Sequence, residues 1–152
     1  MSLDRGQLLK DACDQALDDP AFAPAGGVTH CNQAVQLIAA IMGYSGFAGL
    51  LADQIVALMA SSPDWRAATG SEAAIYALSG GLAVAGMSSK RLGEAHGHVA
   101  AVYPVGMGHS ASLGHDVPTV ANVGKFCGIC LSTEAFPVAV GEADYWIWNP
   151  AE

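Results

Sequence analysis

The 152-residue chain contains little charge, and most of it is negative: six Lys and Arg against fourteen Asp and Glu give a formal net charge of −8. Proteins that bind nucleic acids or anionic lipids use clustered basic residues, so the sequence predicts neither partner. No apolar run reaches the roughly 20 residues of a transmembrane helix, so we expect no membrane span. The repeats of collagen and coiled coils are also missing. The four cysteines are too few and too unevenly spaced for a disulfide-rich scaffold.

What the chain does have is enough apolar sequence for a folded domain. Hydrophobic residues make up 52% of it, and a chain of this length buries roughly two-thirds of its unfolded surface. We therefore expect a single domain over residues 1–152. The N-terminal residues carry charge throughout and lack the apolar segment of a signal peptide. That pattern predicts a protein made in the cytoplasm, or one from which a leader has been removed.

The first half of the chain carries helical patterns. Apolar residues recur at helical spacing over residues 3–18, 32–42 and 47–60, which predicts three helices. Residues 69–72 match a capping box, which predicts a short fourth helix ending at residues 80–81. The residues expected to face inward in the third helix are Ala48, Leu51, Ile55 and Leu58.

The second half of the chain carries strand patterns. Short apolar runs at residues 82–86, 98–103, 117–123 and 145–148 predict strands. Residues 106–116 combine Gly, Ser and two His, which predicts an exposed loop. Helices followed by strands favour an α+β domain in which N-terminal helices pack on a C-terminal antiparallel sheet.

Cys31 is the first candidate for chemistry, because it follows Gly26 and Gly27 and stands at the start of a predicted helix. The free N–H groups and partial positive charge at a helix N-terminus stabilise a thiolate. We therefore expect a lowered thiol pKa and a nucleophilic Cys31. The same N–H groups are suited to hold an oxyanion. A buried structural cysteine is the alternative reading of the same position.

A cysteine nucleophile needs a base, and His98 opens an apolar strand directly after Gly97. Side chains two apart share a strand face, and we expect the face of His98 to meet the helix that begins at Cys31. A third polar group would orient the imidazole. Asn122 on the following strand is the first candidate, because its amide oxygen accepts a ring N–H. Asp116, in the predicted loop, is the second.

This order of residues resembles the papain-like cysteine peptidases of the NlpC type, which cleave bacterial cell-wall peptides. Within that group the layout is most similar to the small amidase effectors delivered by type VI secretion. The matching segments are residues 29–35, 80–86, 97–102 and 118–124. Many NlpC-type enzymes have Asp before the cysteine and Ser-Gly after it, whereas this chain has His30 before it and Asn32-Gln33 after it.

The resemblance implies a papain-like fold and a peptidoglycan hydrolase with Cys31 as nucleophile, His98 as general base and acid, and Asn122 as the orienting residue. It places His30 and Asn32 where they would contact substrate. The bond implied is γ-D-glutamyl to diaminopimelate in the stem peptide, and the implied site of action is the periplasm or cell wall. A periplasmic immunity protein is an implied partner. We expect no metal and no cofactor.

Other sequence features allow other readings. A non-catalytic papain-like module would bind wall peptide or a partner protein. Cys127 and Cys130 form a C-x-x-C pair, which is typical of a redox motif, half a zinc site, a strand-end pair or a disulfide to Cys13. Four of the histidines raise the possibility of zinc, although no H-E-x-x-H is present. Three residues are candidates for local attraction of an anionic substrate: Lys90, Arg91 and Lys125.

Overall fold

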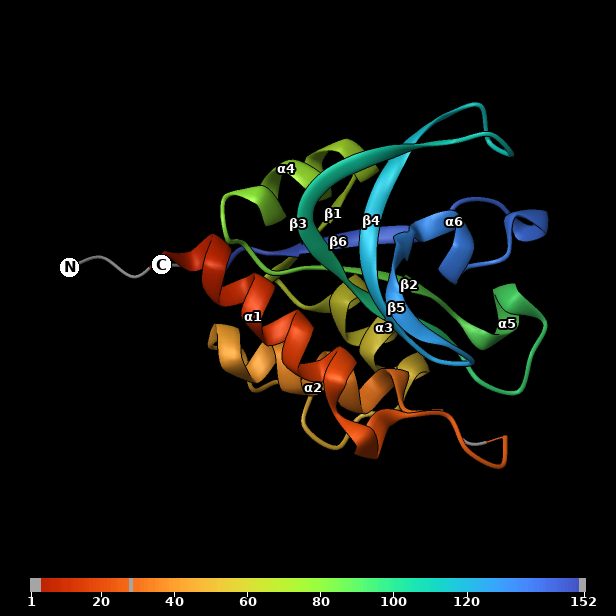
Figure 1. Ribbon diagram of the computed structural model, residues 1–152, viewed down its shortest axis with the longest axis horizontal. Helices are drawn as coiled ribbons and strands as arrows, with labels where there is room; N and C mark the ends of the chain where they lie inside the picture. The colour runs from red at the N-terminus through yellow and green to blue at the C-terminus, as the bar shows by residue number, and fades with distance from the viewer. Residues whose placement is uncertain (1–3, 28, 151–152) are drawn as a thin grey trace.

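The computed structural model describes residues 4–27 and 29–150, and it is an α+β structure (Figure 1). The predicted helices and antiparallel sheet are both present. The helices are α1 (Arg5–Asp18), α2 (Cys31–Met42), α3 (Ala52–Ser61), α4 (Gly70–Leu78), α5 (Ser89–Leu92) and α6 (Ser132–Ala135), with 3-10 turns η1 (Pro20–Phe22) and η2 (Val138–Val140). The strands are β1 (Trp65–Ala68), β2 (Ala83–Met87), β3 (His98–Ser110), β4 (His115–Val123), β5 (Cys127–Leu131) and β6 (Asp144–Trp148).

The six strands form one antiparallel sheet in the order β1-β6-β2-β3-β4-β5. Helices cover both of its faces. Tyr103 of β3 donates a hydrogen bond to Asp14 of α1 at 2.7 Å, and α1, α2 and α3 lie together on that side (Figure 1). Tyr145 of β6 bonds Ser132 of α6 at 2.8 Å on the other side. The core lies between the sheet and α1–α3, where Leu9, Ile38 and Ile55 are fully buried or nearly so.

Local sequence explains where these helices start and stop. Asp4 caps α1 by accepting a hydrogen bond from the N–H of Gln7, and Thr69 and Glu72 form the predicted capping box at α4. Gly43 ends α2 in the left-handed conformation, with φ of 106°. The predicted start of the first helix at residue 3 lies outside the described residues.

Several predicted boundaries are wrong. Residues 106–116 are not a loop, because β3 continues to Ser110 and β4 begins at His115. Only the tip of that hairpin turns, at Gly114 with φ of 77°. The third helix begins at Ala52, so residues 47–51 lie outside it. Ala48 and Leu51, predicted to face inward, are exposed, and Leu58 is half-buried; only Ile55 is buried as predicted. Strands β1 and β5 were not predicted.

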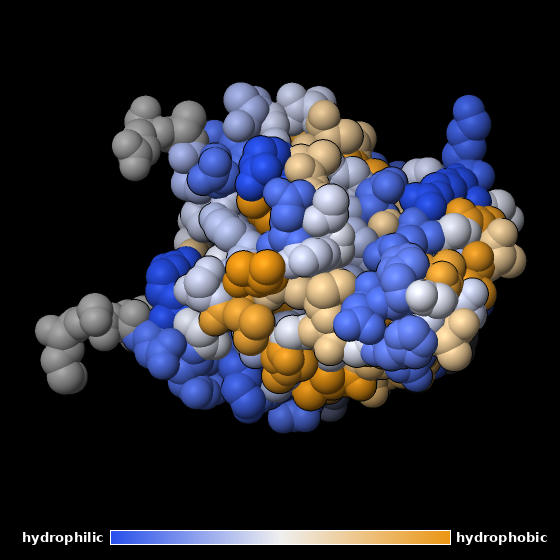
Figure 2. Space-filling view, turned by 90° about the horizontal axis from the view of Figure 1, so that it is seen from above, coloured by the Kyte–Doolittle hydropathy of each residue, from blue (hydrophilic) through white to orange (hydrophobic). Residues whose placement is uncertain are grey.

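The outer surface is mixed. Figure 2 looks onto the side on which α4 lies at the top of Figure 1, and it shows apolar residues gathered in patches among polar ones. Ile75 and Leu78 of α4 and Val105 of β3 are more than half exposed. Exposed apolar side chains are common on folded proteins and by themselves assign no partner. In the part of the chain that the structure describes, no helix is both long and apolar enough to cross a membrane.

Candidate active site

The structure brings His98 and Asn122 together. Nε2 of His98 lies 2.7 Å from Oδ1 of Asn122, and Asn122 is only 2% exposed. The register between β3 and β4, with Ala101 opposite Ala121, explains the contact. One step further along, Asn122 stands opposite Ala100, which shares its strand face with His98. The two side chains are therefore diagonal neighbours on one face of the sheet.

The orientation of the Asn122 amide is fixed by the backbone. Its Nδ2 donates to the carbonyl oxygen of Phe126 at 3.0 Å, so Oδ1 is the atom that faces His98. Because Oδ1 only accepts, Nε2 of His98 carries the proton, and Nδ1 keeps a free lone pair. Nδ1 is thus the nitrogen suited to act as a base. Asp116 lies instead beside His109 at the far end of the hairpin, 3.4 Å from its Nδ1, so Asn122 rather than Asp116 partners His98.

Close packing also holds the imidazole in place. The ring of Phe136, just after α6, lies 4.9 Å from that of His98 between centroids. A Cβ at Gly124 would come within 3.1 Å of Cε1 of His98. Gly97, directly before His98, has no room for a side chain, since a Cβ there would lie 2.6 Å from Oδ1 of Asp53. The two glycines therefore let the chain pass close to the imidazole and to α3.

Burial is the main influence on the charge of His98. It lowers the pKa of the imidazole below its ordinary value, and the positive charge of Lys125 adds to that effect. The hydrogen bond that Nε2 of His98 donates to Asn122 and the negative charge of Glu94 oppose it. With its pKa lowered, His98 is neutral at neutral pH, which is the protonation state that a general base requires.

Cys31 is the first residue of α2 and is 7% exposed. Burial raises the pKa of its thiol above the usual value, and the backbone N–H groups of Val99, Asn32 and Cys31, which approach the sulfur, oppose the shift. The expected lowering of the thiol pKa is therefore wrong for this structure. The helix N-terminus does act on the sulfur as predicted, but loss of water outweighs it.

The prediction that the strand face of His98 meets the helix beginning at Cys31 is also wrong. The side chain of His98 lies on the face that carries α6, whereas α2 lies with α1 and α3 on the other. The sulfur instead approaches β3 at the backbone N–H of Val99, one residue after His98. The side chains of Cys31 and His98, both within the described residues, form no hydrogen bond with each other.

An open cleft of about 890 Å³ borders the His98–Asn122 pair. Both residues line it, together with the Gly-rich segment before α2, the segment before β3, the turn after β4 and the end of α6. Thr29, two residues before Cys31, lines it as well, whereas the buried Cys31 is not among the lining residues. Such a volume is typical of a site for a small molecule or a short peptide.

The two predicted substrate-binding residues lie elsewhere. Asn32 donates its side-chain N–H to the carbonyl of Leu50 at 3.1 Å, which ties α2 to the segment before α3. The Nδ1 atom of His30 lies 2.5 Å from Oε1 of Gln33, within the first turn of α2. Neither is among the residues that line the cleft. In this structure their side chains hold the N-terminal turn of α2 rather than face the cleft.

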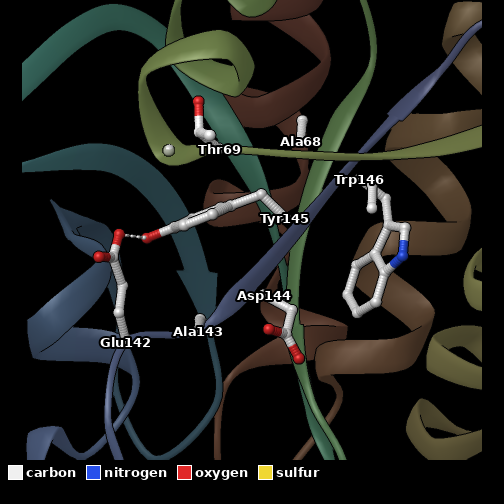
Figure 3. Close-up of a pocket in the computed structure, with 9 residues that line it drawn as sticks. Ala68, Thr69, Glu142, Ala143, Asp144, Tyr145 and Trp146 are labelled. Carbon is white, nitrogen blue, oxygen red and sulfur yellow. Dashed lines mark hydrogen bonds between the residues drawn. The ribbon is translucent and has the colours of Figure 1, made fainter.

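A second, smaller pocket of about 330 Å³ lies between the β1–α4 connection and residues 142–146 (Figure 3). In it the hydroxyl of Tyr145 donates to Oε2 of Glu142 at 2.6 Å, and the close-up shows the two side chains pointing toward each other. The same hydroxyl bonds Oγ of Ser132 at 2.8 Å. This network fastens α6 to β6, and because Phe136 follows α6, it indirectly holds the ring that packs on His98.

The cysteine and metal alternatives find little geometric support. All four cysteines are free. Cys127 and Cys130 stand three positions apart in β5, so their Cα atoms are about 10 Å apart, beyond the reach of a disulfide. Cys13 is fully buried inside α1 and pairs with neither. Within residues 4–27 and 29–150, no group of three His, Cys, Asp or Glu is placed to hold a metal ion.

Sequence reasoning missed the residues that orient the pair. Phe126 contributes a backbone carbonyl, Gly124 contributes the lack of a side chain, and Phe136 contributes a ring from a distant segment. Only the glycine had a local signal, as the residue that ends the β4 pattern.

A comparison of the sequence with models of known protein families and with curated proteins finds no match.

Proposed function

We propose that this protein is a papain-like cysteine amidase or endopeptidase of the NlpC type, which hydrolyses peptide bonds in bacterial peptidoglycan stem peptides. The arrangement of Cys31, His98 and Asn122 carries the proposal. Cys31 begins a helix, its sulfur approaches the backbone next to His98, and His98 is oriented by Asn122 at 2.7 Å. A thiol, a neutral imidazole and an orienting amide beside one cleft are the groups that thiol-based acyl transfer requires.

The proposal assigns a definite role to each group. Nδ1 of His98 takes the proton from Cys31, and the thiolate attacks the amide carbonyl to form an S–C bond. Backbone N–H groups at the start of α2 stabilise the negative oxygen of the tetrahedral intermediate. His98 then gives its proton to the leaving amine as the C–N bond breaks. Water hydrolyses the thioester with His98 as base, which restores the thiol.

The substrate class follows from the resemblance to NlpC-type enzymes and from the size of the cleft. We infer cleavage of the γ-D-glutamyl–diaminopimelate bond, in the periplasm or cell wall of the attacked bacterium. Delivery as an antibacterial effector would require the producing cell to hold a periplasmic immunity protein. The open cleft of about 890 Å³ offers the surface that such a protein would have to cover.

The test is digestion of purified Gram-negative peptidoglycan, with product masses read by mass spectrometry. We expect stem-cleaved muropeptides from the wild type and none from Cys31→Ala or His98→Ala. Cys130→Ala is the matched control, because Cys130 lies on β5 and does not line the cleft. Identical products from wild type and Cys31→Ala, or none from the wild type, would overturn the proposal.

A non-catalytic papain-like module that binds wall peptide or a partner protein is the second candidate. It is favoured by the raised pKa of the buried Cys31 thiol and by the lack of a hydrogen bond between Cys31 and His98. Iodoacetamide labelling near pH 6 separates the two functions, because an activated thiol reacts there and an ordinary one does not. Selective labelling of Cys31 over Cys13, Cys127 and Cys130 supports the enzyme, and equal labelling supports the binding module.

A further inference from the structure

The cleft beside His98 contains an unengaged positive charge. Lys125 lines the cleft directly after Gly124, the residue at which a Cβ would lie 3.1 Å from Cε1 of His98. Its side chain is exposed, and among the described residues no carboxylate forms an ion pair with it. Lys125 also lies close enough to His98 for its charge to act on the imidazole. A free ammonium group beside the reacting groups is a ready partner for an anion.

Most other cations of this acidic protein are already engaged. Lys10 pairs with Asp14 at 2.8 Å, Arg66 with Glu72 at 3.6 Å and Arg91 with Asp144 at 3.1 Å. The guanidinium of Arg5 donates to the carbonyl of Met42. Lys90 lies on α5 and does not line the cleft. Of the six Lys and Arg, all within the described residues, Lys125 alone combines a free charge with a place in the cleft.

The negative charges of the cleft limit where an anion can bind. Glu94 and Glu134 both line it. Glu134 lies on α6, where Oε1 accepts the N–H of Leu131 at 3.0 Å and so stays in place. Glu94 lies in the segment before His98. A carboxylate entering the cleft is repelled by both and attracted by Lys125, so its position along the cleft is determined.

We propose that Lys125 is a specificity-determining residue that binds a free carboxylate of the substrate close to the scissile amide. The inference rests on the proposed function and deepens it. Lys125 would select among peptides of the same sequence by the charge beside the scissile amide bond. A stem peptide whose D-glutamyl α-carboxylate is free meets this requirement. The same peptide with that group amidated does not.

The experiment compares two synthetic stem peptides that differ only in a free or amidated D-glutamyl α-carboxylate. We expect the wild type to hydrolyse the free acid with a kcat/KM about tenfold higher, which corresponds to about 1.4 kcal/mol of transition-state stabilisation. Lys125→Met should lose this preference, because it should slow cleavage of the free acid about tenfold more than cleavage of the amide. Lys90→Met is the matched control, and it should keep the preference.

A binding measurement separates failure of this inference from failure of the proposed function. Calorimetric titration of both peptides is made with Cys31→Ala and with Cys31→Ala combined with Lys125→Met. A preference for the free acid that disappears with the lysine supports the inference, even if the wild type hydrolyses neither peptide. Hydrolysis without a preference, or a preference that survives Lys125→Met, overturns the role of Lys125 and leaves the amidase intact. Absence of both hydrolysis and binding overturns both.

Discussion

Asn122 sets the protonation pattern of His98. With its amide nitrogen committed to the carbonyl of Phe126, Asn122 presents only an acceptor to Nε2 of His98 at 2.7 Å. The proton of the neutral imidazole therefore stays on Nε2, and the lone pair stays on Nδ1. The Asn122 amide fixes the position of the imidazole proton only because its own orientation is fixed. The carbonyl of Phe126 fixes that orientation by accepting a hydrogen bond from the amide nitrogen.

Replacing Asn122 by Ala removes this orientation. General acid–base groups contribute about 10²–10⁴-fold to rate, and we expect Asn122→Ala to lose about 10- to 100-fold of kcat on a stem peptide. Asn32→Ala is the control, because Asn32 bonds Leu50 outside the cleft. Steady-state kinetics with a circular dichroism check of folding measures the effect. Equal rates for Asn122→Ala and wild type would contradict the role of the amide.

The pH dependence of hydrolysis should follow His98. Burial lowers the pKa of its imidazole, so the base is protonated only below its ordinary value of about 6.5. We expect kcat/KM to be level near neutral pH and to fall as the pH drops through that lowered pKa. The hydrogen bond that His98 donates to Asn122 raises this pKa. The acid limb of Asn122→Ala should therefore move to lower pH, whereas an acid limb above about pH 6.5 in the wild type would contradict the assignment.

Gly124 should be required for activity more than for folding. A Cβ at this position would lie 3.1 Å from Cε1 of His98, so Gly124→Ala displaces the imidazole. Displacement of a reacting group by about 1 Å can cost about 10²-fold in rate, so a shift of a few tenths of an ångström should cost less than that. Overpacking costs about 1–3 kcal/mol of stability. Gly128→Ala on β5 is the control, because its Cβ meets nothing within 4 Å. Rates and urea unfolding are compared, and equal rates for the two variants would refute the close approach.

The network at the smaller pocket predicts a stability effect. Tyr145→Phe removes a hydroxyl that bonds both Glu142 and Ser132 in a buried position. Loss of hydrogen bonds to a charged group and to a hydroxyl should lower the free energy of unfolding by about 1–3 kcal/mol. Tyr44→Phe is the control, since the structure gives the hydroxyl of Tyr44 no hydrogen bond among the described residues. Chemical denaturation measures both, and similar midpoints would contradict the network.

The sequence predicted the elements that rest on local patterns and missed those that rest on distant partners. Helical periodicity placed the helix after Cys31, and the Val-rich run located the strand after His98. Strand β1 has only four residues and forms because Trp65 pairs with Trp148, far along the chain. The hairpin at residues 106–116 carries loop-type residues, yet cross-strand pairing of His109 with Asp116 keeps it extended. Tertiary pairing overrides local composition in both cases.

The candidate site shows the same division. Local patterns indicate Cys31, His98 and Asn122, whereas the contact between the last two depends on the register of β3 and β4. The pKa of Cys31 was predicted in the wrong direction, because the helix N-terminus is visible in the sequence and burial is not. The faces of the sheet were also assigned wrongly, since no local pattern shows that helices cover both sides.

The place of β6 has a consequence for biosynthesis. The last strand lies between β1 and β2, so residues 144–148 separate two strands that are made much earlier. While the ribosome is still translating the preceding residues, β1 lacks its neighbour and the sheet has a gap beside β2. Domains fold as units during synthesis, so this sheet can close only when β6 has emerged. Until residues 144–148 have been made, the sheet is incomplete and β2 presents an unpaired edge to which chaperones can bind.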